Sequence, residues 1–460
     1  MAIVCLPTHP NRDCNAATIT CNAFLFLVCR GKTYAMKKIL LLNPPFHQKI
    51  SRDSLCPHIC KSDYSWPGMD LVAISGILSA ENIEYVDCLK ENICLQDLGR
   101  RLQLIKPDFV FMLIASISEK DDVAAINVIK QTTNATIAVL GDIATFDADR
   151  VAVMPGIGFV IRDYTNTIEI RKICKMEQKT RVIDFALINN FKIGIPRHEL
   201  FQKYNYYYPY SLYDHVTPVL ANYGCPFKCK MCNSGSLKYR TRDSAEVMQE
   251  LAYIRQLGIK EIYFKDYTFL VVNNRSILQF MIDHNLGLRF SCTTRIDAVD
   301  KDKLELLKRA GCYLVFYGVE SGSNAILQCM NKGFTAERAK EIISLTKSLG
   351  IEVLTSFVIG FEQETEQDII KTADIIFATD PDYLSLNILE SRQGSELDNL
   401  RREGIKIISG ECMSDIRKRI ERKFYFRPYK LLKYVRLFSK SPCRIKRSIR
   451  QLRSMIMRVS

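Results

Sequence analysis

The 460-residue sequence has no run of eighteen apolar residues free of charge, so it predicts no membrane-spanning helix. It also lacks a low-complexity tract, and its start has neither the basic stretch nor the small-residue cleavage site of a secretory leader. Met36-Lys37-Lys38 directly precedes an apolar strand pattern. We therefore expect residues 1–35 to be a non-native or disordered N-terminal extension.

The chain also lacks an even distribution of charge. Its net charge is +14, yet residues 401–460 hold 19 Lys and Arg against 4 Asp and Glu, while the rest holds 45 against 46. Basic tails favour anionic surfaces such as membranes or nucleic acid. A solvated helical face is the plainer interpretation of the same pattern.

The seventeen cysteines do not form the even, regularly spaced set of a small secreted framework. Most can be buried apolar thiols. Their number and scatter favour a reducing compartment, so we expect a cytoplasmic protein.

Apolar strands alternate with helical patterns in the first part of the chain, which predicts a doubly wound α/β domain over residues 36–165. Such sheets bind ligands at the carboxyl ends of their strands. The expected strands are 39–42, 84–87, 109–114 and 137–140, and the expected helices are 66–83, 95–105 and 121–131. Residues 166–215 break this rhythm with six tyrosines and two prolines, and we interpret them as a linker that packs across domains.

The alternation resumes over residues 216–400 with about six strand–helix units, which predicts a partial (β/α)6 barrel with its chemistry at the carboxyl ends of the strands. The expected strands are 219–222, 261–264, 289–293, 313–317, 353–359 and 383–389. The expected helices are 245–257, 275–284, 301–309, 323–330, 336–349 and 364–378. Residues 401–460 are expected to form a basic helical tail.

One motif carries chemistry: Cys225, Cys229 and Cys232 lie within eight residues, just after the first expected barrel strand. Thiolates are soft ligands that suit zinc and iron–sulfur clusters. Three thiolates can hold three irons of a cubane and leave the fourth open for another ligand. Zinc would need a fourth Cys or His nearby, and His215 is ten residues away with no second Cys pair following.

This motif, three Cys spaced by three and then two residues, resembles the radical S-adenosylmethionine superfamily over about residues 218–400. The family usually has an aromatic residue before the third Cys, where this chain has Met231. The resemblance implies a [4Fe–4S] cluster and S-adenosylmethionine, with an open iron that binds the amino and carboxylate groups of the cofactor. Reductive cleavage then gives a 5′-deoxyadenosyl radical. It implies no further protein residue as catalytic.

The resemblance also implies a set of cofactor-binding residues. Asp266, in the segment 262–269, would receive the methionine ammonium, and Arg295 could pair with the cofactor carboxylate. Gly318, Glu320 and Ser321 resemble the segment that contacts the ribose. Gly360 lies in the strand and turn on the adenine side, where Glu362 stands in place of the usual Pro. An N-cap role for Asp266 and a surface role for Arg295 are the alternatives.

Residues 36–165 resemble the cobalamin-binding domain found before many radical enzymes. They lack the Asp-x-His-x-x-Gly loop, and Leu140-Gly141-Asp142 and Arg162-Asp163 depart from the usual Gly-Gly and Gly-Glu. Cobalamin would imply methylation of an unactivated carbon, although ring-forming relatives exist. A scaffold that no longer binds cobalamin is the alternative.

The expected partners are a small-molecule or lipid-like substrate and an external flavodoxin- or ferredoxin-type electron donor. The tail would cap the barrel and could touch the inner face of the membrane. A cobalamin-independent enzyme similar to tRNA methylthiotransferases is one alternative, but residues 36–165 lack the further three-Cys motif of that family, so nucleic acid is not an expected partner. A non-catalytic binding protein with a vestigial site is the other.

Overall fold

The computed structural model describes residues 36–54, 57–60, 65–174, 181–271, 274–361, 363–390, 392, 394–396, 411–430 and 432. The expected N-terminal extension and most of the expected basic tail lie outside these residues. From Lys37 onward the chain forms one compact unit, which is the unit considered below. Within the described residues, no helix has the length and apolar character needed to cross a membrane.

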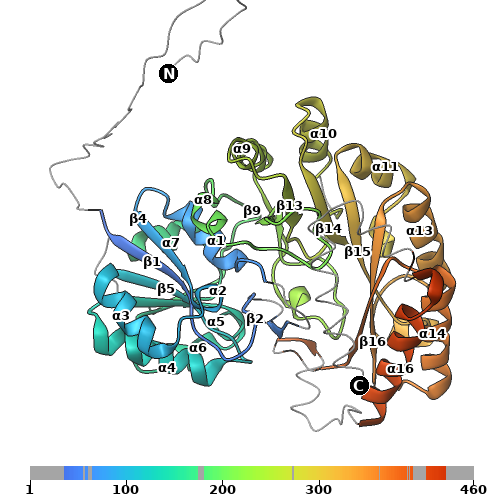
Figure 1. Cartoon of the computed structure of the whole chain (residues 1–460), viewed down its shortest axis with the longest axis horizontal. Coiled ribbons are helices and arrows are strands. Elements are labelled where there is room, and N and C mark those ends of the chain that lie inside the picture. Colours follow the sequence, from blue (N-terminus) through green and yellow to red (C-terminus); the bar gives the residue numbers. More distant parts are fainter. Residues whose placement is uncertain are drawn as a thin grey trace, which may run out of the picture. The chain divides into compact units, whose positions relative to one another are not determined.

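The first half of the unit is built on a six-stranded parallel sheet with the order β4-β1-β5-β6-β7-β8 (Figure 1). Its strands are β1 (Lys38–Asn43), β4 (Asn82–Asp87), β5 (Phe109–Leu113), β6 (Thr136–Leu140), β7 (Phe159–Ile161) and β8 (Val182–Ile183). Its helices are α1 (Met69–Ile77), α2 (Cys88–Glu91), α3 (Leu95–Ile105), α4 (Glu119–Thr132), α5 (Asp142–Phe146), α6 (Ala148–Ala152) and α7 (Thr167–Ile173).

The central strands β1, β5 and β6 are apolar over most of their length because helices bury both faces of the sheet. One buried cluster joins the sheet to α1 and α7, and a second joins its other face to α3, α4, α5 and α6. The doubly wound α/β prediction is therefore confirmed. The order reverses between β1 and β5, so the point at which such sheets bind ligands lies at the carboxyl ends of these two strands.

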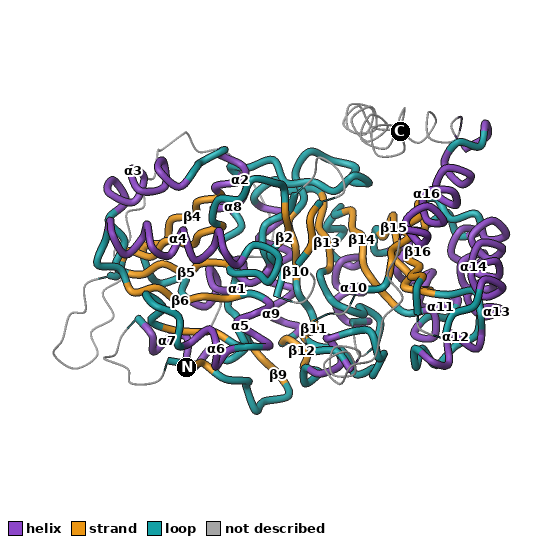
Figure 2. The backbone as a smooth tube through the Cα atoms, turned by 90° about the horizontal axis from the view of Figure 1, so that it is seen from below, coloured by secondary structure: helices purple, strands orange, loops and turns teal. Residues whose placement is uncertain are grey.

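The second half is a curved parallel sheet with the order β10-β13-β14-β15-β16-β17, which confirms the partial barrel (Figure 2). Its strands are β10 (Thr217–Val219), β13 (Glu261–Phe264), β14 (Arg289–Thr294), β15 (Cys312–Glu320), β16 (Glu352–Ile359) and β17 (Tyr383–Ile388). Its helices are α9 (Ser244–Gln256), α10 (Arg275–Asp283), α11 (Lys301–Arg309), α12 (Asn324–Cys329), α13 (Ala336–Ser348) and α14 (Glu366–Thr379).

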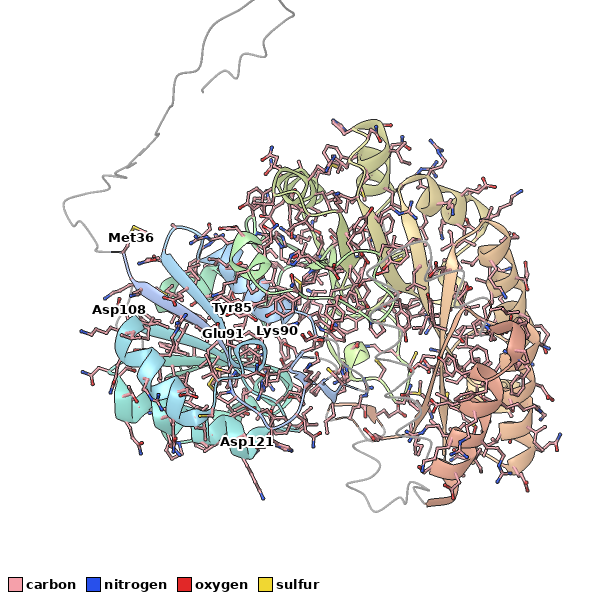
Figure 3. The ribbon with its side chains drawn as sticks, in the orientation of Figure 1. Met36, Tyr85, Lys90, Glu91, Asp108 and Asp121 are labelled. Carbon is pink, nitrogen blue, oxygen red and sulfur yellow. The ribbon has the colours of Figure 1, made fainter. Side chains whose placement is uncertain are left out.

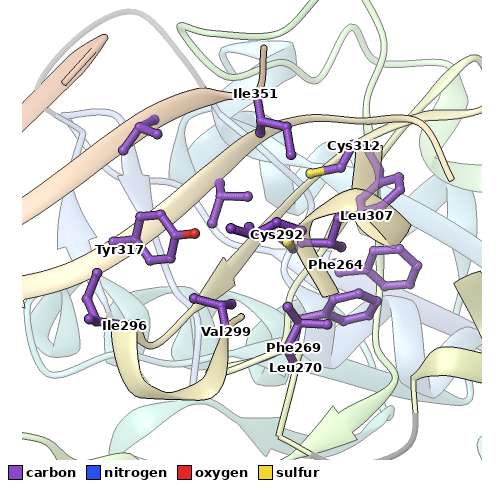
Figure 4. Packing of buried hydrophobic residues seen from close by; sticks show 14 of the residues in the cluster. Phe264, Phe269, Leu270, Cys292, Ile296, Val299, Leu307, Cys312, Tyr317 and Ile351 are labelled. Carbon is purple, nitrogen blue, oxygen red and sulfur yellow. The ribbon is translucent and has the colours of Figure 1, made fainter. Parts of the chain in front are cut away.

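A large apolar core fixes these barrel strands against their helices (Figure 4). Phe264 and Phe269 stack with ring centroids 4.2 Å apart, and Phe264 meets Phe290 edge to face at 5.3 Å. Cys292 and Cys312 are fully buried in the same core, as expected for structural apolar thiols. The strand ends that carry the site therefore project from a packed, rigid base.

The helix α16 (Glu411–Tyr425) covers the last barrel strand. The hydroxyl of Tyr425 donates to the carbonyl of Leu384 at 2.6 Å and accepts from its amide at 3.0 Å. Asp380 receives Arg427 at 2.7 Å and Lys430 at 2.9 Å. The described part of the tail thus caps the free edge of β17, which would otherwise expose unpaired backbone groups.

The segment expected to be a linker that packs across domains, residues 166–215, holds more regular structure than expected. It contains α7, and β8 extends the first sheet beyond the expected boundary at residue 165. Further on come β9 (Asn190–Phe191) and α8 (Glu199–Gln202). The strand β9 pairs with β12 (Arg240–Arg242), which in turn pairs with β11 (Asn222–Tyr223), so the segment ties the two halves together. Two-residue strands are too short to show a periodic pattern.

The tyrosine-rich end of that segment contacts Tyr85, Lys90 and Glu91 of the first domain, which are labelled in Figure 3. The hydroxyls of Tyr85 and Tyr206 are 2.7 Å apart, and Tyr206 donates to Asp87 at 2.5 Å. The Tyr204 hydroxyl donates to Glu91, and Lys90 lies over the Tyr206 ring. Four other small elements are the paired strands β2 (Ile50–Ser51) and β3 (His58–Ile59) and the 3₁₀ helices η1 (Asn233–Ser236) and η2 (Ile296–Ala298).

Candidate active site

The three-cysteine loop begins just after β11 and ends in η1, at the carboxyl end of the barrel strands. Gly224 opens it with φ +73°, and a Cβ there would come within 2.7 Å of the Lys238 carbonyl oxygen. At the other end, a Cβ on Gly235 would come within 2.6 Å of the Phe227 carbonyl oxygen. The two glycines let the loop fold tightly enough to turn its thiols to one side.

All three thiols of the loop are free, with Cys225 buried and Cys229 and Cys232 half-buried. Burial raises the pKa of the Cys225 thiol to about 11, and the neighbouring Cys232 and Cys229 act in the same direction. Such thiols need a positive metal centre to hold them as thiolates. No three His, Cys, Asp or Glu side chains of the described residues converge on one point that could hold a single ion. A cubane has no such requirement, because each cysteine ligates a different iron.

Asp266 lies two residues beyond β13 and is only 2% exposed. Its Oδ2 accepts from the Ala221 amide at 3.3 Å, while its Oδ1 is buried without a hydrogen-bond partner. Burial raises the pKa of this carboxyl to about 7. An unpartnered buried carboxylate oxygen is costly unless a donor meets it. Its chemistry fits the ammonium group of S-adenosylmethionine.

Arg295 follows β14 and lies against the cysteine loop. Its Nη1 is 3.1 Å from Cys229 Sγ, and its guanidinium carbon stands 3.8 Å from the centre of the Phe227 ring. Asp297 accepts from Nε and Nη2 at 2.8 and 2.7 Å, and the Lys332 carbonyl also accepts from Nη2. The surface role is therefore wrong. The guanidinium meets a cluster-loop thiol and Asp297, and pairing with a cofactor carboxylate stays a prediction.

Gly318 and Glu320 lie at the end of β15, where the strand register shifts. Glu320 has φ +76°, which costs a non-glycine residue about 1–2 kcal/mol. A Cβ on Gly318 would come within 2.5 Å of Glu320 Oε1, and that oxygen is 3.4 Å from Lys332 Nζ. Strained backbone of this kind concentrates at ligand-binding positions.

Ser321 turns away from this pair. Its hydroxyl is fully buried, 3.2 Å from Thr372 Oγ1, and accepts from the Ser323 amide at 3.1 Å. It fixes the turn into α12, and its expected contact with ribose stays a prediction.

Gly360 ends β16 with φ +97°, and its amide donates to Glu364 Oε2 at 2.6 Å. Beside it, Phe361, Ile326, Met330 and Leu389 form a small buried apolar cluster, with Met231 packed against it. The residue that departs from the family's aromatic therefore packs with the apolar surface next to Gly360. Glu362 lies outside the described residues.

In the first domain, the point of strand-order reversal holds a buried ion pair. Arg52 is 2.9 Å from Asp122, and it also donates to Asn43 Oδ1 at 2.8 Å and to the Pro44 carbonyl at 2.9 Å. Around it the strand ends are small or polar, with Ala115, Ser116, Gly141 and Asp142. The only histidine of the described residues in the loop after β1 is His47, which is exposed. Small strand ends at a switch point fit a large planar cofactor held chiefly by backbone and hydroxyl groups.

The two halves meet through residues that sequence analysis missed. Lys265, next to Asp266, donates to Asp53 Oδ2 at 2.8 Å, and Trp66 Nε1 donates to the same oxygen at 3.0 Å. Lys265 also lies 4.7 Å from the Trp66 ring centre. The position of Lys265 at the end of a barrel strand was the only available signal, since Asp53 and Trp66 are about 200 residues away.

Comparison with known proteins agrees with this arrangement. Residues 219–376 match the family model of the Radical SAM superfamily. An uncharacterized methyltransferase of Pyrococcus horikoshii is 25% identical over 90% of this chain and 98% of its own. The anaerobic magnesium-protoporphyrin IX monomethyl ester cyclase of Rubrivivax gelatinosus is 22% identical over 69% of this chain and 63% of its own.

Solved structures share the fold of both halves. The radical S-adenosylmethionine methyltransferase TsrM of Kitasatospora setae, with cobalamin and a [4Fe–4S] cluster bound, has a TM-score of 0.62 at 14% identity, covering 82% of this chain and 77% of its own. The cobalamin-dependent radical enzyme OxsB has a TM-score of 0.57 at 19% identity, covering 80% and 55%.

The cysteine loop on a partial barrel, together with the family match over residues 219–376, identifies the second half of the chain as a Radical SAM domain. The first half shares its fold with those two structures, both of which contain cobalamin.

Proposed function

We propose that the protein binds a [4Fe–4S] cluster through Cys225, Cys229 and Cys232 and cleaves S-adenosylmethionine reductively. Two features support this most. The tight loop holds three free thiols, and Asp266 has a buried oxygen without a hydrogen-bond partner. When bound and reduced, the cluster supplies the electron that releases a 5′-deoxyadenosyl radical from the cofactor.

The chain's own residues then have positioning roles. Asp266 binds the methionine ammonium, since a cation at hydrogen-bond distance offsets the free-energy cost of burying a carboxylate. Glu320, held at its strained position beside Gly318, binds the ribose hydroxyls. The apolar cluster beside Gly360 covers the adenine and excludes water from the reacting groups.

We further propose that cobalamin lies between the carboxyl ends of the first sheet and the barrel, and that the reaction methylates an unactivated carbon. The small strand ends at Ala115, Ser116 and Gly141, the methyltransferase named among the relatives, and the cobalamin named for two neighbouring structures support this. The substrate is a small natural product or lipid-like molecule, and a flavodoxin or ferredoxin delivers the electron. A cytoplasmic protein that touches the inner membrane face through its basic tail fits such a substrate.

One experiment tests these proposals together. The full chain is reconstituted anaerobically with iron and sulfide and given dithionite and S-adenosylmethionine, with and without cobalamin. Formation of 5′-deoxyadenosine supports the radical enzyme, and a cobalamin spectrum retained through gel filtration supports the first domain as its site. A protein that binds no cluster would instead support a vestigial site, and cleavage without retained cobalamin would support a cobalamin-independent enzyme.

The relatives leave two other reactions to distinguish. A putative methylthiotransferase of Methanocaldococcus jannaschii is 31% identical over 38% of this chain and 42% of its own, and the cyclase above forms a ring. Methylation gives S-adenosylhomocysteine together with 5′-deoxyadenosine. Sulfur transfer to tRNA or ring formation without S-adenosylhomocysteine would contradict the methylation proposal.

A further inference from the structure

We propose that Arg295 is a positioning residue for the cluster, which holds Cys229 and raises the cluster's reduction potential. This rests on the proposed function, because it assumes that Cys229 ligates iron. It assigns Arg295 to the protein side of the cluster and away from the cofactor carboxylate.

The contacts of Arg295 leave its guanidinium little freedom. Asp297 takes Nε and Nη2 in a two-pronged ion pair at 2.8 and 2.7 Å, and the Lys332 carbonyl takes Nη2 as well. The remaining nitrogen, Nη1, points to Cys229 Sγ at 3.1 Å. A planar guanidinium fixed on one side presents its other edge in a defined direction.

The loop itself closes around this side chain. Phe227, between the first two cysteines, stacks on the guanidinium at 3.8 Å, and Phe334 lies over it at 5.7 Å. Arg295 is only 7% exposed, so water screens its charge poorly. Arg295 therefore contacts the loop at two points, the ring of Phe227 and the sulfur of Cys229.

A hydrogen bond and a positive charge at a ligating sulfur stabilise the reduced cluster, which carries one more negative charge. Removing Arg295 also leaves the Asp297 carboxylate unopposed near the cluster. Both effects lower the reduction potential, so the neutral variant should be harder to reduce. Removing the Asp297 charge as well should restore part of the loss.

The test is a redox titration of the reconstituted full chain. The amount of reduced cluster at each potential is measured by electron paramagnetic resonance. Arg295→Met should lower the ratio of reduced to oxidised cluster at a fixed solution potential at least tenfold, a shift of about 59 mV for one electron. Arg295→Met with Asp297→Asn should recover part of this shift. Arg289→Met is the matched control, because Arg289 begins the strand β14 that Arg295 follows, about 20 Å away at ~3.3 Å per residue.

An Arg295→Met cluster with the wild-type potential, or an equal shift in Arg289→Met, would overturn the inference. If Arg295→Met takes up no cluster, the same titration is made with Arg295→Gln. A wild-type potential in that variant would also overturn the inference. Loss of cluster uptake in both variants, with wild-type melting temperature and normal uptake by Arg289→Met, supports the positioning of Cys229. A wild-type chain that binds no cluster would refute the proposed function itself, which is a separate outcome.

Discussion

Lys265, at the carboxyl end of barrel strand β13, donates to Asp53 of the first domain across 2.8 Å. Burial alone would raise the pKa of Asp53, and Lys265 together with the hydrogen bonds from Ser51 and Trp66 holds it below its usual value. The pair fixes the carboxyl end of the barrel against the loop that follows β1 of the first sheet.

The first prediction follows from this pair. Lys265→Met leaves the Asp53 carboxylate buried without its cation and should lower the free energy of unfolding by about 3 kcal/mol. Chemical denaturation measures this loss. The double change Lys265→Met with Asp53→Asn should lose less than Lys265→Met alone, and equal losses would show that the ion pair is not the cause.

The buried carboxylate of Asp266 should destabilise the cluster-free chain at high pH, although it favours the binding of S-adenosylmethionine. Its pKa is raised to about 7 by burial, so the stability it contributes is complete below its ordinary pKa of 3.8 and is lost as the pH rises through 7. Asp266→Asn should therefore make the cluster-free chain more stable than wild type at pH 8 by at least about 1 kcal/mol, with little gain at pH 4. The same change should weaken the binding of S-adenosylmethionine to the loaded protein at least tenfold.

Denaturation at the two pH values and equilibrium dialysis measure these effects. Asp70 and Asp122 also have raised pKa values, but both chains retain them, so their contributions cancel. A stability difference that does not change with pH would contradict the assignment.

Gly318 tests the position of Glu320. Gly318→Ala places a methyl group 2.5 Å from Glu320 Oε1, a side-chain end that can move. We expect a chain that folds normally, with stability within about 1 kcal/mol of wild type, and binds S-adenosylmethionine several-fold more weakly because the carboxylate is displaced. Gly99→Ala in α3, where an added Cβ makes only ordinary contacts at 3.6 Å, is the control. Equal affinities in both variants would argue against a ribose role for Glu320.

Tyr425 tests the capping role of α16. Tyr425→Phe removes the partner of both the amide and the carbonyl of Leu384 and should cost about 1–3 kcal/mol of stability. Tyr429→Phe loses one exposed hydrogen bond to Asp380 and should cost less than about 0.5 kcal/mol. Thermal denaturation of the two variants compares them, and equal melting temperatures would contradict capping.

Much of the fold could be predicted because its elements are long and regular. The structure reproduces the expected bounds of α3, β13 and α11, each of which has a Pro, Gly or Asp within three residues of an end. Helix α1 is shorter than expected, since the chain turns at Leu78. The short strands β8 and β9 carried no pattern, so their pairing came from the tertiary structure alone.

The site shows the same division. Spacing located the three cysteines, because their chemistry lies within eight consecutive residues. The contact of Arg295 with Cys229 joins residues 66 apart, and the turn of Ser321 toward Thr372 depends on α14. Neither contact can be predicted from neighbouring residues in the sequence. The sequence could therefore indicate Arg295 and Ser321 as site residues but not the groups that their side chains contact.

The central claim is that Cys225, Cys229 and Cys232 hold a cluster that cleaves S-adenosylmethionine. The most direct measurement compares wild type, Cys229→Ala and Cys94→Ala after anaerobic reconstitution, by bound iron and by 5′-deoxyadenosine formed with dithionite. Cys94 is the control, since it is an exposed free thiol of the first domain, outside the loop. We predict about four irons per chain and cleavage in wild type and Cys94→Ala, as a [4Fe–4S] cluster requires, and loss of both in Cys229→Ala. Undiminished cleavage by Cys229→Ala would contradict the account.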